Sequence, residues 1–328
     1  MTLSLSRRAF ALGLPTTALI LGALPRVAGA TAASAPTDAV TPLAQISIGR
    51  FTVTALSDGY GDMPFGYFPG RTAEQVEARA QFAARPTGIR FVFNQYLVKD
   101  GERRILIDTG PASSLGQTGQ LPDALAARGI RRDQLDAVIV THLHQDHLGG
   151  LVAGGRRNFP NAEVYVDRRD VKHWTDPAKQ VRAPDYLQNS FSFSGELVRL
   201  YPRLQAVDGE PGIMRGVSIV DLTGHTPGHI GVRIEDAGQR LIMVSDMLFP
   251  VVHPAAIDVN FLFEQDRPAA QAMRARFFPR AAEEGALITA THMPFPGLGR
   301  IVSESGRLPR DRHCGRTRRA PRSRRGQA

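Results

Sequence analysis

Apolar and polar positions along the chain predict strands and helices in turn. Residues 46–59 (ISIGRFTVTALSDG) alternate between the two kinds, as a half-buried strand does. Two apolar runs, at 89–98 and 103–110, flank a Lys-Asp-Gly turn, which indicates a hairpin. The same criteria predict further strands at 136–142, 216–224, 229–236, 239–247 and 286–293, a strand followed by a helix at 162–174, and helices at 71–86, 121–129 and 267–285.

These elements form two similar halves in which mostly apolar strands alternate with helices. Strands of this kind need cover on both faces, so we expect sheets flanked by helices in an α/β protein. With 42% apolar residues among 328, the chain is able to bury a globular core. The segment 60–70 mixes aromatic residues with Gly and Pro and is expected to be a loop, whereas 175–215 is expected to be irregular.

The formal charge of +9 at first suggests a nucleic-acid partner, but its distribution argues against one. Residues 1–30 contain three arginines and no acid, and residues 307–328 contain nine arginines and one aspartate. The ends therefore carry +11, which leaves −2 on residues 31–306. A nearly neutral body disfavours a nucleic-acid partner.

The N-terminus has the pattern of an export signal. Ser-Arg-Arg-Ala-Phe (6–10) precedes a short apolar run (11–24) and an A-x-A cleavage pattern (28–30), so we predict a twin-arginine signal peptide over 1–30. A Sec signal or an uncleaved anchor is the alternative, although the run is short for a membrane span. The expected location is periplasmic or secreted, with no stable membrane span after cleavage.

The remaining segments outside the domain are a linker and a tail. Residues 31–45 are small, polar and Pro-containing, which is typical of a linker before the main domain at 46–301. Residues 302–328 are basic and nearly devoid of apolar side chains, so we expect disorder there; a reading-frame shift near residue 306 would produce the same composition. The only cysteine, Cys314, lies in this tail, which excludes an intrachain disulfide and a thiolate metal site.

The sequence THLHQDHLGG (141–150) follows a predicted buried strand and concentrates metal-binding side chains. His142, His144, Asp146 and His147 form the pattern H-x-H-x-D-H. On a turning segment the first two project from one side and the last two lie further round, so the stretch can serve two adjacent cations. Imidazole and carboxylate groups bind Zn²⁺ and similar divalent ions. A His-rich surface loop is the alternative, but three of nine histidines within six positions disfavour it.

This pattern after a strand resembles that of the metallo-β-lactamase superfamily, whose members fold as an αββα sandwich of two mixed sheets flanked by helices. The family completes its site at three later strand ends, and this chain has a match at each, in TGHTPGH (223–229), VSDM (244–247) and THMPFPGLG (291–299). The resemblance spans about residues 46–301. It implies one ion held by His142, His144 and His225, a second held by Asp146, His147 and His292, and Asp246 bridging them.

Two further residues are expected beside these ligands. Asp108, in the tract IDTG, resembles a family aspartate that braces the metal-binding loop. His229 is expected to pack beneath the loop or to hydrogen-bond to a ligand rather than to bind metal.

Two cations about 3.5–4 Å apart activate a bridging hydroxide and polarise the substrate, so the implied chemistry is hydrolysis. Zinc is the expected metal, and Mn, Co or Fe accept the same ligands. The tracts FTVTALSDG, NQYLV, FPNAEVYVD, GHTPGH and FPGLG are similar to the branch that contains methyl parathion hydrolase and its lactonase and arylesterase relatives. Members of this branch are often dimers, so a homodimer is expected.

The resemblance also bears on the substrate, a small ester, lactone or phosphotriester. In acyl-homoserine lactonases a tyrosine three residues after the bridging aspartate assists the leaving oxygen, and here that position is Phe249. Aryl oxides have pKa values near 10 and need less help, which favours aryl esters, aryl lactones and organophosphate triesters. The expected aromatic pocket comprises Trp174, Phe191 and Phe249, with Phe65 and Tyr67 at its rim; ordinary apolar packing is the alternative for each.

Other functions fit the sequence less well. An acyl-homoserine lactonase is the first alternative, and a periplasmic β-lactamase would use the same metals but is disfavoured by the aromatic N-terminal loop and the FPGLG ending. A nuclease would need a basic groove. A non-catalytic metal-binding protein would be expected to lack a ligand, and no ligand is missing.

Overall fold

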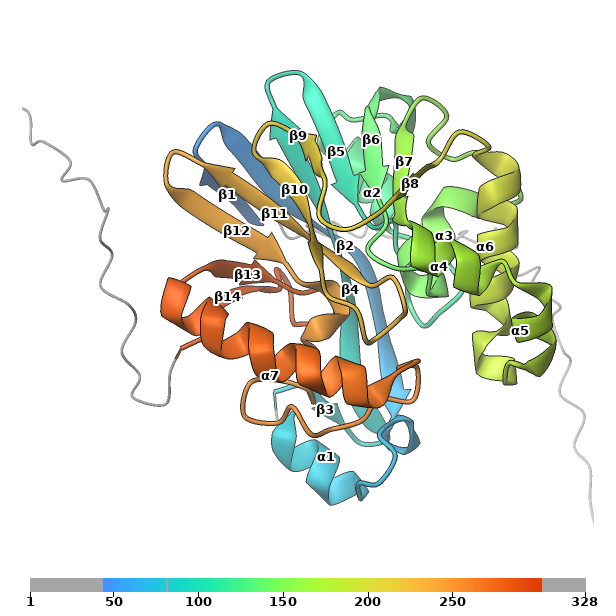
Figure 1. The fold of residues 1–328 in the computed structure, drawn as a ribbon, viewed down its shortest axis with the longest axis vertical. Helices are drawn as coiled ribbons and strands as arrows, with labels where there is room; N and C mark the ends of the chain where they lie inside the picture. Colours follow the sequence, from blue (N-terminus) through green and yellow to red (C-terminus); the bar gives the residue numbers. More distant parts are fainter. Residues whose placement is uncertain (1–43, 81, 303–328) are drawn as a thin grey trace, which may run out of the picture. The chain divides into compact units, whose positions relative to one another are not determined.

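The computed structural model describes residues 44–80 and 82–302 (Figure 1). The expected signal peptide, nearly all of the expected linker and the basic tail beyond residue 302 lie outside the described residues. No helix of the described part is both long and apolar enough to cross a membrane.

Two mixed β-sheets carry helices on their outer faces (Figure 1). The first sheet has the order β1-β2-β4-β5-β6-β7-β8, with β3 paired to β4, and the second has the order β14-β13-β12-β11-β10-β9. Strands of the first sheet are β1 (Ala44–Ile48), β2 (Phe51–Pro64), β3 (Ala84–Arg85), β4 (Gly88–Asp100), β5 (Arg103–Ile107), β6 (Ala137–Ile139), β7 (Glu163–Asp167) and β8 (Gln205–Val207). Those of the second are β9 (Gly212–Met214), β10 (Val217–Asp221), β11 (Ile230–Asp236), β12 (Gln239–Met243), β13 (Leu287–Thr289) and β14 (Leu298–Arg300).

Each helix lies between two strands in the order of the chain. They are α1 (Ala73–Arg79), α2 (Leu121–Ala126), α3 (Gln145–Val152), α4 (Arg168–Trp174), α5 (Pro177–Arg182), α6 (Gln188–Leu200) and α7 (Arg267–Glu284), with short 3₁₀ turns η1 (Phe65–Tyr67), η2 (Arg132–Gln134), η3 (Asp185–Leu187) and η4 (Ser245–Met247). This arrangement confirms the predicted αββα sandwich of two mixed sheets.

Side-chain alternation along the strands builds the layers. In β10, Ile219 points into the core between the two sheets, whereas its neighbour Val220 points outward to pack with α7. In β12, Met243 points into the core between the sheets and Ile242 points outward to pack with α7. The outer face of the first sheet packs on α2, α3 and α6 through a second apolar cluster. At one edge of this layered arrangement, strand ends from both sheets lie close together, and the loops that follow them carry polar residues.

The N-terminal strand prediction needs correction. The stretch 46–59 is two strands, because the chain turns at Gly49, which has a φ of 54°. The second strand, β2, then runs on to Pro64, into the predicted loop at 60–70. Pairing with β4 shifts register between Ser57 and Tyr60, and this bulge lets the pairing continue past Gly59.

The segment predicted to be irregular contains regular structure. Helix α6 lies within 175–215, and its buried stripe includes Phe191, Ser194 and Leu197, spaced three apart. Serines occupy some of the buried positions of this helix, and they conceal the apolar period that predicts a helix. The predicted helix at 71–86 is shorter, since α1 ends at Arg79.

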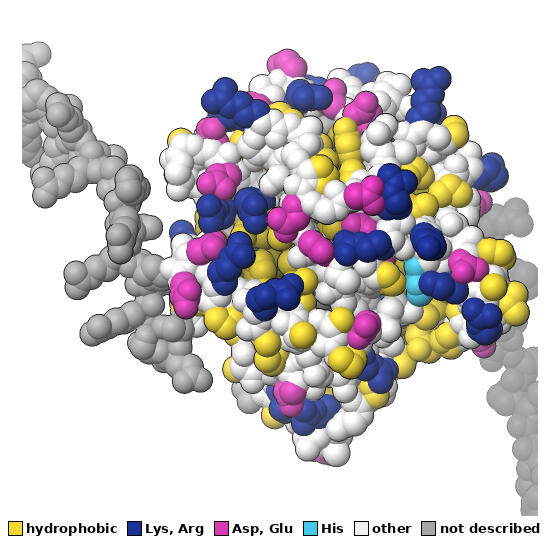
Figure 2. Space-filling view, viewed as in Figure 1, with side chains coloured by type: hydrophobic (Ala, Val, Ile, Leu, Met, Phe, Trp, Pro, Cys, Tyr) yellow, Lys and Arg dark blue, Asp and Glu magenta, His cyan; other side chains and the backbone are white. Residues whose placement is uncertain are grey.

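The surface agrees with a nearly neutral body. On the face shown in Figure 2, Lys and Arg side chains are interspersed with Asp and Glu side chains. This mixture gives no continuous basic surface on that face.

Candidate metal centre

Loops at strand ends bring the seven predicted ligands together. His142 and His144 follow β6, Asp146 and His147 lie in the first turn of α3, His225 lies between β10 and β11, Asp246 lies in η4 after β12, and His292 follows β13. Asp146 is partly exposed and the other six are buried. Two sheets and one helix thus contribute to a single cluster.

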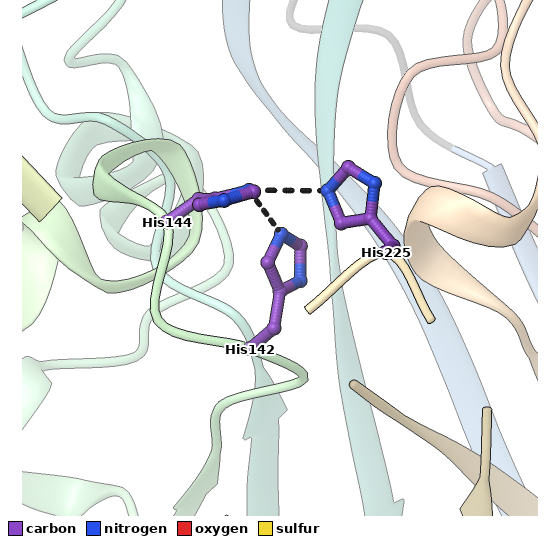
Figure 3. Close-up of side chains that lie close together, drawn as sticks. All are labelled: His142, His144 and His225. Carbon is purple, nitrogen blue, oxygen red and sulfur yellow. Dashed lines mark hydrogen bonds between the residues drawn. The ribbon is translucent and has the colours of Figure 1, made fainter. Parts of the chain in front are cut away.

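The first group of ligands is a set of three imidazoles (Figure 3). His144 Nδ1 lies 3.0 Å from His142 Nε2 and 3.1 Å from His225 Nε2. Ligand atoms at about 2.0–2.1 Å from one tetrahedral ion are separated by about 3.3 Å. The three nitrogens are therefore spaced as ligands of one ion.

The second group contains Asp146, His147 and His292. Asp146 Oδ2 lies 3.6 Å from His147 Nε2 and 3.3 Å from His292 Nε2. These separations also match ligands of a single divalent ion.

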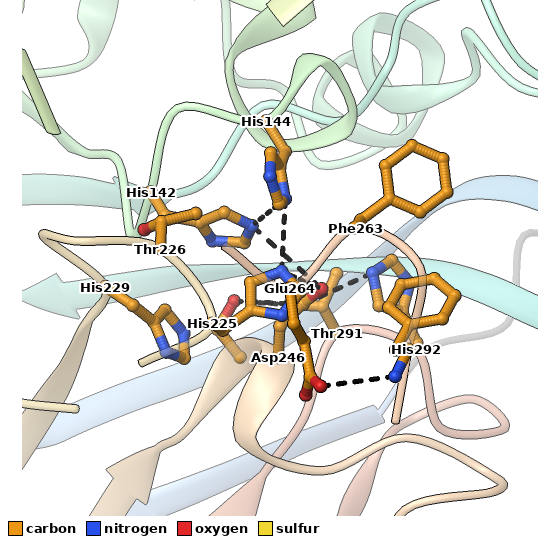
Figure 4. Close-up of polar contacts among 12 residues, drawn as sticks. His142, His144, His225, Thr226, His229, Asp246, Phe263, Glu264, Thr291 and His292 are labelled. Atoms are coloured by element: carbon orange, nitrogen blue, oxygen red, sulfur yellow. Dashed lines mark hydrogen bonds and ion pairs between the residues drawn. The ribbon is translucent and has the colours of Figure 1, made fainter. Parts of the chain in front are cut away.

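Asp246 lies between the two groups and faces each with a different oxygen (Figure 4). Its Oδ2 is 3.3 Å from His225 Nε2 and 4.0 Å from His142 Nε2. Its Oδ1 is 3.3 Å from His147 Nε2 and 3.2 Å from His292 Nε2. This is the geometry of a carboxylate that bridges two ions.

Burial sets the charge of the histidine triad. Desolvation lowers the pKa of His142 and His225 well below the usual value and lowers the pKa of His144 to about 4. The three imidazoles are consequently neutral at pH 7 and have lone pairs for a cation.

The other side of the centre attracts positive charge. Burial alone would lower the pKa of His292, but Asp246 and Asp146 raise it to about 9. The pKa of His147 is likewise raised, against desolvation, by Asp246, Asp146 and Asp108. A divalent cation supplies the positive charge that these carboxylates favour.

Asp108 orients one ligand. Its Oδ2 lies 2.8 Å from His147 Nδ1 and its Oδ1 accepts from Thr141 N at 2.7 Å. With Nδ1 engaged, His147 Nε2 points toward the carboxylates, is buried, and has no hydrogen-bond partner among the described residues. A buried nitrogen left in this way fits a metal ligand. The histidines and carboxylates together fit a binuclear site for divalent metal.

His229 packs beside the ligands. Its ring centre is 5.1 Å from that of His142, and its Nδ1 lies 3.1 Å from the carbonyl oxygen of Leu222. It belongs to none of the ligand groups found within residues 44–302.

Asp170 is a supporting residue that the sequence analysis missed. It is fully buried, and its carboxylate accepts hydrogen bonds from Leu143 N at 2.9 Å, Gly228 N at 2.6 Å and Thr226 Oγ1 at 3.0 Å. It therefore ties the loop between His142 and His144 to the loop that carries His225. Its place at a strand end, in DRRD, was the available signal.

A cavity of about 390 Å³ opens over the metal centre. His144, Asp146, Asp246 and His292 contribute to its lining. Its other sides are made of aromatic and apolar residues together with a few polar ones, namely Met63, Pro64, Tyr67, Phe91, Leu115, Tyr186, Phe261 and Phe263 with Asp62, Gln145, Asp185 and Asn189. The ligands are accordingly accessible to a small molecule from one side.

The predicted pocket residues are placed differently from expectation. Of the five, Tyr67 lines the cavity and the other four do not. Trp174 is fully buried between His144 and Phe191, with ring-centre distances of 5.1 and 4.8 Å. Trp174 and Phe191 therefore lie behind the predicted ligand His144, where α4 and α6 pack together.

Phe249 and Phe65 also lie outside the cavity lining. Phe249 is fully buried behind two residues that do line it, with ring centres 5.5 Å from Phe91 and 4.9 Å from Phe261. Phe65 is partly buried against the same apolar cluster. The wall itself is formed by Phe91, Phe261 and Phe263, which sequence reasoning missed.

The chain is similar in sequence to known hydrolases. A family model described as metallo-beta-lactamase superfamily matches residues 89–292. The chain is 28% identical over 156 residues to a hydroxyacylglutathione hydrolase of Aeromonas salmonicida, covering 47% of this chain and 46% of that protein. It is 25% identical over 171 residues to an N-acyl homoserine lactonase of Bacillus thuringiensis, covering 45% and 61%. The chain thus spans about half the length of the curated relatives that it matches.

The similarity to solved structures covers more of the chain than the similarity to these relatives. The hydrolase AbOPH, of the beta lactamase superfamily, is 28% identical with a TM-score of 0.73, covering 81% of this chain and 95% of that one. AidC, a dizinc quorum-quenching lactonase, is 25% identical with a TM-score of 0.71, covering 80% and 95%. Both likenesses extend over most of the described residues.

Proposed function

The chain belongs to the metallo-β-lactamase superfamily, and we propose that it is a metal-dependent hydrolase that cleaves neutral esters with good leaving groups. The proposed substrates are aryl esters, aryl lactones and organophosphate triesters. The observation that carries this proposal is an aromatic cavity above two ligand groups that share Asp246.

Two divalent ions at this centre would lower the pKa of a water molecule and polarise the carbonyl or phosphoryl oxygen of the substrate. Zinc is the proposed metal, with Mn, Co or Fe as alternatives. The protein's own contribution is to fix the ligands: Asp246 presents one oxygen to each group, and Asp108 holds the His147 ring. The aromatic wall excludes water and places the ester beside the ligands.

The charge of the cavity favours neutral substrates. Among the described residues that line it there is no lysine or arginine, whereas Asp62 and Asp185 lie at its sides. Thioesters of glutathione and of coenzyme A are anionic, and so are β-lactams with their carboxylate. Apart from the proposed metal ions, the described lining of the cavity therefore has no lysine or arginine side chain to pair with such substrates, which supports neutral esters over these classes.

The side chain of Phe249 indicates which kind of leaving group the site can release. This residue is buried and has no hydroxyl, so it cannot protonate a departing alkoxide. Aryl oxides have pKa values near 10, close to that of tyrosine, and depart without such a donor. Aromatic rings at Phe91, Phe261 and Phe263 offer a surface for an aryl group to pack against.

An acyl-homoserine lactonase is the second candidate. The likeness to AidC supports it, and the phenols of Tyr67 and Tyr186, which line the cavity, offer hydroxyl groups that Phe249 lacks. If this candidate holds, replacing either tyrosine with Phe lowers kcat for homoserine lactones.

The test is a hydrolysis panel on metal-loaded protein, with aryl acetates, dihydrocoumarin, acyl-homoserine lactones, a phosphotriester and a β-lactam, and with Asp246→Ala as the inactive control. We expect the highest kcat/KM for aryl esters and aryl lactones. A strong preference for homoserine lactones would reject the argument from Phe249. Hydrolysis of none of these substrates by protein containing two metal ions would reject the proposed function.

We further propose that the enzyme acts as a homodimer outside the cytoplasm, after export by the twin-arginine route. The paired arginines at 7–8 and the A-x-A pattern at 28–30 support export. Replacing the arginine pair with lysines should retain the protein in the cytoplasmic fraction. Light scattering should give the mass of a dimer.

A further inference from the structure

One arginine of α7 points into the protein interior instead of into solvent. Arg274 has 0% of its surface exposed and is among the largest fully buried side chains. Burying a guanidinium is costly unless charge and hydrogen bonds compensate it. Its partners therefore indicate what the residue does.

Two of these partners are backbone carbonyls of the segment that carries the bridging aspartate. Arg274 Nε donates to the oxygen of Met247 at 3.1 Å, and its Nη2 donates to the oxygen of Asp246 at 3.4 Å. Turn η4 has only three residues, and Ser245 within it has a φ of 47°. So short a turn supplies few donors for its own carbonyls, and Arg274 fixes the two peptide groups on either side of Met247.

The third partner, Glu264, lies in the loop that carries the aromatic wall of the cavity. Glu264 is 5% exposed and accepts a hydrogen bond from Arg274 Nη2 at 2.5 Å. Its other oxygen accepts from Phe261 N at 3.2 Å. Phe261 and Phe263, on either side of Leu262 and next to Glu264 in the chain, both line the cavity.

The same loop is held to two other parts of the site. Leu262 N donates to the oxygen of Tyr67 at 2.8 Å, and Gln265 N donates to the oxygen of His225 at 2.9 Å. One buried ion pair thus joins the bridging aspartate, a ligand loop and the aromatic wall.

We propose that Arg274 and Glu264 are positioning residues that set the Asp246 carboxylate against the two ligand groups and keep the aromatic wall in register with it. A buried ion pair adds little net stability over an apolar pair of the same volume. Its hydrogen bonds are directional, however, and an apolar pair cannot orient two carbonyls and a loop amide. The pair therefore contributes the orientation of these backbone groups rather than net stability.

The test compares four variants with the wild type. Arg274→Lys retains the charge but replaces the fork of donors with a single ammonium. Glu264→Gln removes the negative charge. The double variant Arg274→Met with Glu264→Leu removes both charges together and leaves no unpaired ion. Arg280→Met is the matched control, because Arg280 lies on the same helix with a side chain 66% exposed and pairs only with Glu284 in the described structure.

Three quantities are measured: the chelator concentration that removes half of the metal, kcat and KM for an aryl ester at saturating metal, and the unfolding temperature of the metal-free chain. We expect Arg274→Lys and the double variant to lose metal at a chelator concentration at least tenfold lower than wild type. We expect Glu264→Gln to raise KM at least fivefold, because the amide retains only one of the two oxygens that accept from Arg274 and from the wall loop. Arg280→Met should match wild type in metal retention and KM.

A lower unfolding temperature for the double variant, with metal retention and KM equal to those of the control, would show a merely structural pair and overturn the proposal. The metal measurement does not depend on the substrate. If the wild type binds two ions but cleaves no ester, the proposed function fails while metal retention still decides the role of Arg274. Only the KM measurement rests on the proposed function.

Discussion

Replacing Asp108 with Asn tests how strictly one carboxylate fixes a metal ligand. Asp108 has a φ of 58°, in the left-handed region that Asn also tolerates, so the substitution changes side-chain chemistry without adding backbone strain. The amide oxygen can still accept from Thr141 N, now at 2.7 Å. The amide nitrogen, however, takes the place of the oxygen that lies 2.8 Å from His147 Nδ1.

The expected loss of metal affinity follows from the tautomer that His147 must adopt to bind metal. For His147 to bind metal through Nε2, its proton must reside on Nδ1, where it would face the NH₂ group of the new Asn. The ring then either loses this hydrogen bond or moves its proton to Nε2 and stops binding metal. Loss of such a supporting contact costs roughly 10–100-fold in metal affinity, which is about 1.4–2.7 kcal/mol.

The assay is chelator competition on protein loaded with two zinc ions. Asp108→Asn should release one ion at a chelator concentration 10–100-fold lower than wild type, while the ion held by the three imidazoles leaves as before. Asp58→Asn is the control, since Asp58 is also buried but accepts from Gly119 N and Leu121 N, and burial raises its pKa to about 7. Identical release of both ions from Asp108→Asn and wild type would refute the role of Asp108.

Three other substitutions have defined outcomes. Asp246→Ala removes both oxygens between the ligand groups, so turnover should be abolished and metal content should fall; retained turnover would contradict the bridging role. Phe263→Ala removes a ring packed 5.2 Å from Phe261 in the cavity wall, and KM for aryl esters should rise about tenfold with kcat little changed; an unchanged KM would place the aryl group elsewhere. Asp170→Ala leaves the buried amides of Leu143 and Gly228 without an acceptor and should lower the free energy of unfolding by about 2–5 kcal/mol in urea denaturation; a loss below about 1 kcal/mol would show that other groups replace it.

The ligand positions were predictable because strand ends are readable from sequence. Each predicted ligand follows or closely precedes an apolar strand, and strand ends of a layered fold meet at one edge. The structure brings all seven together within two groups that share Asp246. Their roles as ligands stay predictions until metal is measured.

The cavity wall was not predictable in the same way. Phe261 and Phe263 lie in a loop, where no period indicates which side chains face inward. The resemblance placed Trp174 in the cavity, but it packs behind His144 and against Phe191 of α6, a helix that the serine-rich sequence did not predict. A pocket depends on how loops from distant parts of the chain pack, which local patterns do not encode.

Arg274 illustrates a signal that was present but unused. It shares the buried face of α7 with Ala270 and Phe278, each four residues away. A charged residue on an apolar stripe at helical spacing predicts a buried ion pair or a functional contact. Its partner, Glu264, was beyond reach of the pattern because it lies in the preceding loop.

Zinc titration of chelator-stripped protein, followed by aryl acetate hydrolysis, tests the central claim most directly. Two ligand groups that share one carboxylate should give activity that rises until two zinc ions are present per chain and then levels off. A plateau at one ion per chain, or hydrolysis that persists without metal, would contradict a binuclear centre.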